Sequence, residues 1–247
     1  MNNLLESLPS TSVTIYIDPV ASVAPVGTVL GRIFDTEQVR VAERADQSAD
    51  VIVERDGHVA ATSTVTELLR SLLLVNSDIY ITGSRRLEDA KLPETLRVLH
   101  DIPFQLRGYP DSDSEKLLLI AVSRAIERRA FRVGDGTLHV GFQRLSRLVD
   151  EPGTLRVYEQ LAETGVAVHA YGVGDVEPPP ALNLTVRTGT TGLYRDGWFV
   201  VYQPPVGGKA VGLYAIDAGD NQWDGFWTYS AGRVKAMATQ IADETAG

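Results

Sequence analysis

Apolar side chains recur at intervals of three and four along residues 114–133, SEKLLLIAVSRAIERRAFRV. This spacing predicts a long helix with one buried stripe, because residues three and four apart lie on the same helical face. After a glycine turn and a second helix, residues 166–173, VAVHAYGV, form a short apolar run that predicts a strand. The stretch therefore predicts the scaffold of an α/β core, and it contains no recognisable catalytic constellation.

The N-terminal part of the chain has the pattern of strands. Residues 13–18 and 39–44 are rich in β-branched residues and alternate between apolar and polar positions, which predicts two strands. Residues 49–63 contain two β-branched runs on either side of Asp56 and Gly57. Because an Asp-Gly pair accepts the positive φ values of a type I′ turn, we expect a hairpin here.

A helix is predicted directly after this hairpin. Thr64 precedes Glu67 by three residues, which is the spacing of a capping box at a helix N-terminus. A further strand is predicted over residues 78–83, DIYITG, which end at a glycine.

The strongest candidate for a domain boundary lies near residues 102–114, where prolines, acids and small residues cluster. A chain of 247 residues can form one large domain or two smaller ones. We expect an N-terminal α/β subdomain over residues 1–108 and a second subdomain over residues 109–247.

The second half of the chain repeats the order of the first, with strands predicted over residues 182–188, 198–204 and 209–217 and a helix at the end. The glycine-containing runs 134–141 and 172–175 lack the pattern of a nucleotide-binding loop and are interpreted as turns. The predicted fold class is α/β, with mixed β-sheets and flanking helices. The repeated order arises either from two related subdomains or from the coarse likeness of any two α/β segments.

The net charge of −9 and the pI of about 5.0 argue against a compact nucleic-acid-binding protein. Only four of the 23 basic residues are lysines, and this preference for arginine fits either adaptation to concentrated salt (a halophilic protein) or a GC-rich genome. The chain has no cysteine, so disulfides and thiolate metal sites are excluded. It shows neither a signal peptide nor an apolar run long enough to span a membrane, and we expect a cytoplasmic protein.

The histidines show no spacing typical of a metal site, so no metal or cofactor is predicted. His169 lies in the predicted strand and shares a face with Tyr171, opposite Val166 and Val168. A histidine in this position either lines a pocket or is a hydrogen-bonded structural residue. The four histidines are His58, His100, His139 and His169.

Aromatic residues crowd into residues 198–229, which hold all three tryptophans. Such a density builds either a core or a cleft for a planar ligand. Arg128, Arg129, Arg144 and Arg147 offer a further option, because neighbouring guanidinium groups bind phosphates, although pairing with surface acids is the ordinary explanation. The residues that we consider for ligand binding are Gln143, His169, Tyr171, Trp198, Tyr202, Phe226 and Trp227.

The second half of the chain contains, in this order, AIERRAF, FQRLSRL, YEQLAETGVAVHAYG, WFVV and FWTY. Together these segments resemble the DICT sensory domain, a family named for diguanylate cyclases and two-component systems. The resemblance spans about residues 115–243, and the whole chain is similar to the stand-alone acidic form found in salt-loving archaea, where VNSDIYITG and RGYPDSDSEKLLLI also belong. It implies a sensory or regulatory module and not a catalyst.

The expected function is therefore an intracellular signal-transduction module that binds an unidentified small-molecule signal and regulates a partner signalling protein or transcription regulator. We expect no direct contact with nucleic acid and no membrane span, and a homodimer is compatible with this function. One alternative is a dimerisation or docking scaffold without a ligand. The other is a hydrolase-type enzyme that uses buried carboxylates such as Asp196 or Asp224.

Overall fold

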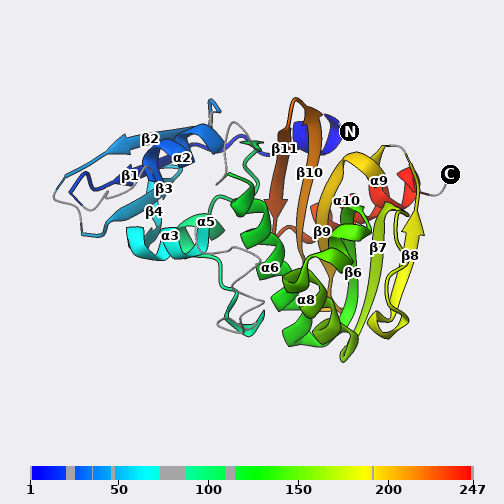
Figure 1. The fold of residues 1–247 in the computed structure, drawn as a ribbon. Coiled ribbons are helices and arrows are strands. Elements are labelled where there is room, and N and C mark those ends of the chain that lie inside the picture. The colour runs from blue at the N-terminus through cyan, green and yellow to red at the C-terminus, as the bar shows by residue number, and fades with distance from the viewer. Residues whose placement is uncertain are drawn as a thin grey trace. The chain divides into compact units, whose positions relative to one another are not determined.

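The protein has a mixed α/β fold with one four-stranded and one seven-stranded sheet, which confirms the predicted fold class (Figure 1). The predicted strand over residues 78–83 lies outside the described part of the chain. The computed structural model describes residues 2–20, 26–34, 36–45, 48–72, 87–108, 115–190 and 192–245.

The chain divides into two compact units, and each is built from more than one segment. The boundary predicted near residue 108 stays a prediction. The first unit holds residues 1–75, 92–121 and 218–226, and the second holds residues 76–91, 122–217 and 227–247.

The first unit contains the four-stranded sheet, with the order β2-β1-β3-β4. The parallel pair of β1 and β2 is connected through a helix, as parallel neighbours require, and the other pairs are antiparallel. Its inward side chains, such as Val13, Ile15 and Val53, are fully buried. The four strands and the two helices that precede or connect them are α1 (Asn2–Glu6), β1 (Val13–Ile17), α2 (Val26–Ile33), β2 (Val39–Glu43), β3 (Val51–Arg55) and β4 (His58–Ser63).

The predicted hairpin and the predicted capping box are both confirmed. Asp56 and Gly57 have φ values of 51° and 80°, as the type I′ turn between β3 and β4 requires. At the start of α3 (Val65–Leu72), the Thr64 amide donates to the Glu67 carboxylate over 2.9 Å and the Glu67 amide donates to Thr64 Oγ1 over 3.1 Å.

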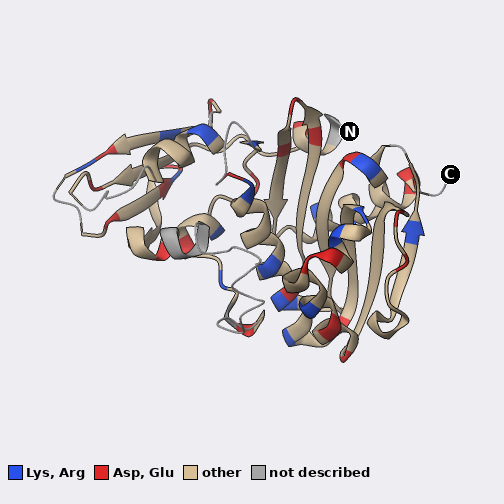
Figure 2. Ribbon diagram, viewed as in Figure 1, with Lys and Arg blue, Asp and Glu red and all other residues tan. Residues whose placement is uncertain are grey.

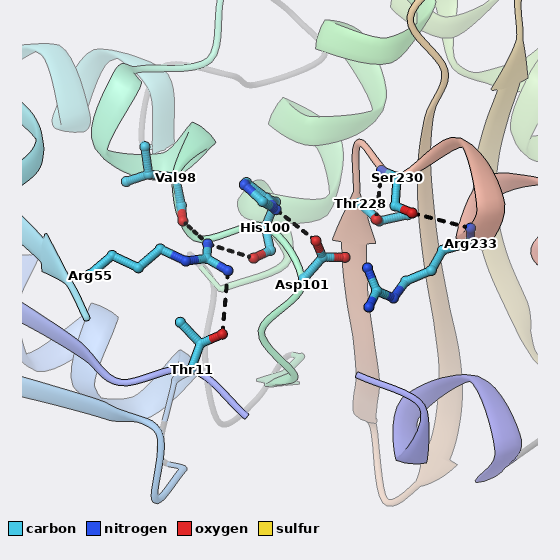
Figure 3. Close-up of polar contacts among 8 residues, drawn as sticks. All are labelled: Thr11, Arg55, Val98, His100, Asp101, Thr228, Ser230 and Arg233. Atoms are coloured by element: carbon cyan, nitrogen blue, oxygen red, sulfur yellow. Dashed lines mark hydrogen bonds and ion pairs between the residues drawn. The ribbon is translucent and has the colours of Figure 1, made fainter. Parts of the chain in front are cut away.

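One arginine of β3 hydrogen-bonds the segment that follows α5 (Glu94–Arg97) (Figure 3). The Arg55 guanidinium donates to the carbonyl oxygens of Val98 and His100 over 2.7 and 3.1 Å, just beyond α5. Strand β5 (Phe104–Arg107) follows and pairs antiparallel with β11 (Gln222–Thr228).

The seven-stranded sheet has the order β5-β11-β10-β9-β6-β7-β8. Strands β6, β7 and β8 are parallel, and β9 is antiparallel to both β6 and β10. The strands of this sheet in the second unit are β6 (Asp135–Arg144), β7 (Gly165–Val173), β8 (Leu184–Thr188), β9 (Gly197–Gln203) and β10 (Val211–Gly219).

The interpretation of residues 134–141 as a turn is wrong, because β6 begins at Asp135. The glycines that suggested a turn have another role. Gly136 has a φ of 100°, and a Cβ at this position would lie 2.5 Å from the Gln203 carbonyl oxygen of β9. Glycine is therefore required by the close approach of the two strands as well as by the backbone conformation.

Helices cover both faces of the second unit's sheet. On one face lie α6 (Lys116–Val133) and α8 (Pro152–Ala162) (Figure 1). Ser123 of α6 accepts a hydrogen bond from Trp198, and Tyr158 of α8 packs edge-on against Phe142. On the other face, α10 packs against β10, where a Cβ at Gly212 would lie 2.7 Å from a sulfur atom of this helix. The remaining helices of this unit are η1 (Leu87–Asp89), α7 (Ser146–Asp150), η2 (Pro180–Leu182), α9 (Leu193–Asp196) and α10 (Ala231–Glu244).

Helix α10 begins at a serine cap: Ser230 Oγ accepts from the Arg233 amide over 3.5 Å, and the Ser230 amide donates to Thr228 Oγ1 over 3.1 Å (Figure 3). No helix in the described residues is both long enough and apolar enough to cross a membrane.

The two sheets share part of their strand order. In the first unit the order is β2-β1-β3-β4, with β1 and β2 parallel. The corresponding strands of the second unit are β8, β7, β9 and β10, again with the first two parallel. They differ because β6 lies between β7 and β9, whereas β1 pairs directly with β3. The duplication of an α/β unit stays a hypothesis.

Candidate functional site

Two histidines lie side by side on one face of the second unit's sheet. His139 of β6 and His169 of β7 are partners in the parallel register, so their side chains project from the same face. The two ring centroids lie 5.0 Å apart, and the ring planes are inclined by 18°. The fold thus joins two imidazoles that are distant in the sequence.

A hydrogen bond joins this pair to the neighbouring strand position. The His139 Nδ1 atom and the Tyr171 hydroxyl oxygen are 3.0 Å apart. Arg187 of β8 acts on the pKa of Tyr171, and Gln203 of β9 acts on the pKa of His139, so both side chains lie near this bond. We name the surface formed by His139, His169, Tyr171, Arg187 and Gln203 the histidine face.

The histidine face is open at one end and closed at the other. Arg187 is exposed, and both histidines and Gln203 are half-buried. At the closed end, Tyr171 is buried and its ring centroid lies 5.5 Å from that of the fully buried Phe199. Part of the sheet surface therefore faces solvent while its aromatic end is fixed in the core.

Burial keeps the two imidazoles neutral. Desolvation, together with His169 and Arg187, lowers the pKa of His139 to about 4, although the neighbouring Gln203 side chain acts in the opposite direction. Burial and the Arg187 charge also lower the pKa of His169. For Tyr171, burial is the main cause of a raised pKa. Near neutral pH, Arg187 is thus the ionised member of the histidine face.

His169 has an unsatisfied polar atom. Its Nδ1 atom is buried and makes no hydrogen bond within the described residues. A buried polar atom without a partner typically destabilises a fold by about 1–3 kcal/mol, so each such atom calls for an explanation. His169 therefore differs from a structural histidine whose two ring nitrogens are hydrogen-bonded.

The arrangement suits binding better than metal ligation. No group of three or more histidine and acidic side chains within the described residues has the geometry to hold a metal ion. The His139 Nδ1 atom is already engaged by the Tyr171 hydroxyl. The histidine face can donate and accept hydrogen bonds and can attract negative charge through Arg187.

Comparison with family models matches residues 96–211 to DICT, described as a sensory domain in diguanylate cyclases and two-component systems. This segment, just under half of the chain, is similar to the DICT family. All five residues of the histidine face lie within the matched segment. Comparisons with curated proteins and with solved structures gave no match. The DICT match confirms the family that the sequence resembles. The matched segment differs from the resemblance over residues 115–243, because it begins at residue 96 and ends before α10.

Of the residues considered for ligand binding, His169 and Tyr171 come together on the histidine face, within the segment that matches DICT. Gln143 lies at the other end of β6, where it is buried with a φ of 63° and accepts a hydrogen bond from Arg147. Trp198 and Tyr202 project from the opposite face of the sheet. The Trp198 Nε1 atom donates to Ser123 Oγ, and the Tyr202 hydroxyl donates to the Asp135 carbonyl oxygen.

Phe226 and Trp227 are fully buried residues of β11. Among the arginines considered for phosphate binding, Arg144 lies 3.6 Å from Asp175 and Arg147 contacts Gln143. The structure therefore brings together two of the seven residues considered, and ligand binding by any of them stays a prediction.

Sequence reasoning missed His139, Arg187 and Gln203. His139 was placed in a predicted turn, and Arg187 was included only as part of the strand predicted over residues 182–188. Each becomes part of the histidine face through strand pairing, since His139 pairs with His169 and Arg187 pairs with Tyr171. The available signal was the alternation of β7, which placed His169 and Tyr171 on one face.

Proposed function

We propose that the segment matching DICT binds a small-molecule signal on the histidine face and that the bound protein regulates a partner protein. The observation that carries the proposal is the open end of this face, where the exposed Arg187 accompanies two neutral imidazoles. One of these, His169, has a buried Nδ1 atom that makes no hydrogen bond within the described residues. A sensory family supports a role in signal detection and favours binding over catalysis. The partner would be a signalling protein or a transcription regulator inside the cell.

Ring contacts connect the histidine face with the C-terminal helix. Tyr171 packs against Phe199, and the Phe199 centroid lies 6.5 Å from that of Tyr214 on β10. The Tyr214 hydroxyl accepts a hydrogen bond from Gln240 of α10 over 3.3 Å. A ligand that binds one arrangement of Tyr171 more tightly than another would shift this packed row, and its effect is limited to that difference in affinity. We propose α10 as the element that presents the change to a partner.

The test is native mass spectrometry of the protein purified at high salt from its own host cells. We expect a fraction of the wild-type protein to carry a bound small molecule. His169→Ala should lose this mass, because it removes the imidazole at the open end of the histidine face. His58→Ala is the matched control, since His58 is an exposed residue on β4 of the first unit.

Retention of the bound mass by His169→Ala would overturn the location, and unliganded wild-type protein throughout would overturn ligand binding itself. The same spectra give the assembly state. A dimer without a bound molecule would favour the docking scaffold instead.

A further inference from the structure

The electrostatic surroundings of the histidine face differ from the composition of the chain. The protein carries a net charge of −9. Within the described residues, the groups whose charges act on His139, His169 and Tyr171 are Arg187, the histidines and Tyr194, and none of them is a carboxylate. Strand β8, LTVRT, contributes one basic residue and no acidic residue (Figure 2).

Arg187 has binding capacity left. It is exposed, and it makes no ion pair with any described residue. Other arginines of this unit are paired, such as Arg124 with Glu127 and Arg195 with Asp196. A guanidinium carries five donors in a planar fork that matches a carboxylate or a phosphate.

His169 supplies a second donor beside Arg187. Its Nδ1 atom makes no hydrogen bond within the described residues, and the ring is half-buried. A neutral imidazole carries one N–H, and the tautomer with this N–H on Nε2 supplies the donor. Thr185, which is exposed on β8 and pairs with His169 in the register, adds a hydroxyl on the same side. The open end is therefore rich in donors.

We infer that the ligand of the histidine face is held through a small anionic group, a carboxylate or a phosphate, by the Arg187 guanidinium and the His169 imidazole. The inference rests on the proposed function and names the chemistry of its signal. Because Arg187 is exposed to water, an isolated anion should bind weakly, with a dissociation constant on the order of millimolar. The remainder of the ligand would supply further contacts.

The experiment follows the imidazole resonances of the full chain by NMR during titration with inorganic phosphate and, separately, with acetate. Sodium chloride is exchanged for each salt at constant ionic strength and constant pH, so that general screening does not change. We expect saturable shifts of the His139 and His169 resonances with at least one of the two anions. The resonances of His58, which is exposed in the first unit, should stay constant.

Arg187→Gln should weaken the binding of that anion at least tenfold, because it removes the charge and the fork of donors. Arg187→Lys keeps the charge without the fork and should give a smaller loss, which provides a second variant if Arg187→Gln does not fold. The matched control is Arg132→Gln, which removes an exposed arginine near the C-terminal end of α6 and should bind as the wild type does.

The outcomes separate the two proposals. Shifts with phosphate alone or acetate alone support the inference and identify the anionic group. Equal affinity in Arg187→Gln and in the wild type would overturn it. A desalted small-molecule extract of the host cells that shifts the His169 resonance, while neither anion does, would overturn the anionic group and leave the proposed function standing. No shift with any of the three would overturn both.

Discussion

Two polar clusters lie on opposite faces of the second unit's sheet, and they differ in whether their charges are balanced. Under α6 and α8, Arg124 Nη1 donates to Glu127 Oε2 over 2.6 Å, and Tyr158 donates to Glu127 Oε1 over 2.7 Å. Arg124, Glu127 and Tyr158 are all buried. On the histidine face, the exposed Arg187 has no acidic partner in the described part of the chain.

The difference teaches which cluster can accept a ligand. A buried charge requires a partner, and the Arg124–Glu127 pair supplies it at the expense of any further binding. Thr154 completes this cluster, because its hydroxyl accepts from Arg124 Nη2 over 2.8 Å and donates to Glu151 over 3.0 Å. Water can solvate Arg187, so this charge needs no internal partner and stays available. We therefore expect changes under α6 and α8 to affect stability, and changes on the histidine face to affect binding.

The largest effect is expected for Glu127→Ala. It leaves the Arg124 guanidinium buried without its acidic partner, and breaking a buried pair in this way typically destabilises a protein by about 3–5 kcal/mol. Chemical denaturation measures the loss in free energy of unfolding. Glu159→Ala is the control, because Glu159 is exposed on α8, and its change should stay below about 0.5 kcal/mol. Similar values for the two variants would show that the buried pair has no special importance.

Tyr158→Phe should have the next largest effect. It removes a hydrogen bond to a buried carboxylate, a type of bond worth about 1.5–3 kcal/mol. Tyr194→Phe removes a bond to a neutral group, the Thr245 carbonyl oxygen, and should destabilise by about 1 kcal/mol. Both values come from the same denaturation series. The reverse order would mean that the charge on Glu127 adds nothing to its bond with Tyr158.

Acidification should lower the free energy of unfolding of the protein, because His139 on the histidine face has a lowered pKa. The pKa of His139 is about 4 in the folded protein and has an ordinary value of 6.5, so the unfolded chain binds more protons between these values. The stabilisation is present above pH 6.5 and is lost as the pH falls toward 4. Because the ring is only half-buried, we expect a loss on the order of 1 kcal/mol between pH 7 and pH 5.

His139→Gln isolates this effect, because glutamine does not titrate. The difference in unfolding free energy between wild type and variant should shrink by that amount from pH 7 to pH 5. The lowered pKa of His169 leaves a smaller pH dependence in the variant. A difference that is constant with pH would contradict the lowered pKa of His139.

The smallest effect on stability is expected for Arg187→Gln. An exposed side chain without an ion pair contributes little to folding, so the free energy of unfolding should change by less than about 0.5 kcal/mol. Chemical denaturation of Arg187→Gln and Glu127→Ala under the same conditions compares the two losses in unfolding free energy. A loss of several kcal/mol would show that Arg187 belongs to the framework of the fold.

The sequence predicted the parts of this molecule that depend on neighbouring residues. Asp56 and Gly57 specify their turn by their own backbone preferences, and Thr64 and Glu67 specify a helix start by their spacing. The buried stripe of α6 also follows from local periodicity, since Leu119, Val122, Ile126 and Ala130 are all buried.

The histidine face depends on strand pairing, which no local pattern contains. Alternation placed His169 and Tyr171 on one side of β7, and this much could be predicted. The positions of His139 and Arg187 required the register of β7 with β6 and with β8. Trp198 and Tyr202 lie on the opposite face of the sheet, where Trp198 hydrogen-bonds to α6 and Tyr202 is fully buried.

The most direct test of ligand binding on the histidine face compares unfolding midpoints with and without a desalted small-molecule extract of the host cells. A ligand that binds the folded state raises its stability according to its concentration and affinity. We predict that the extract raises the midpoint of the wild type and of Tyr158→Phe by similar amounts, and leaves that of His169→Ala unchanged. An equal rise in His169→Ala, or no rise in the wild type, would contradict the account.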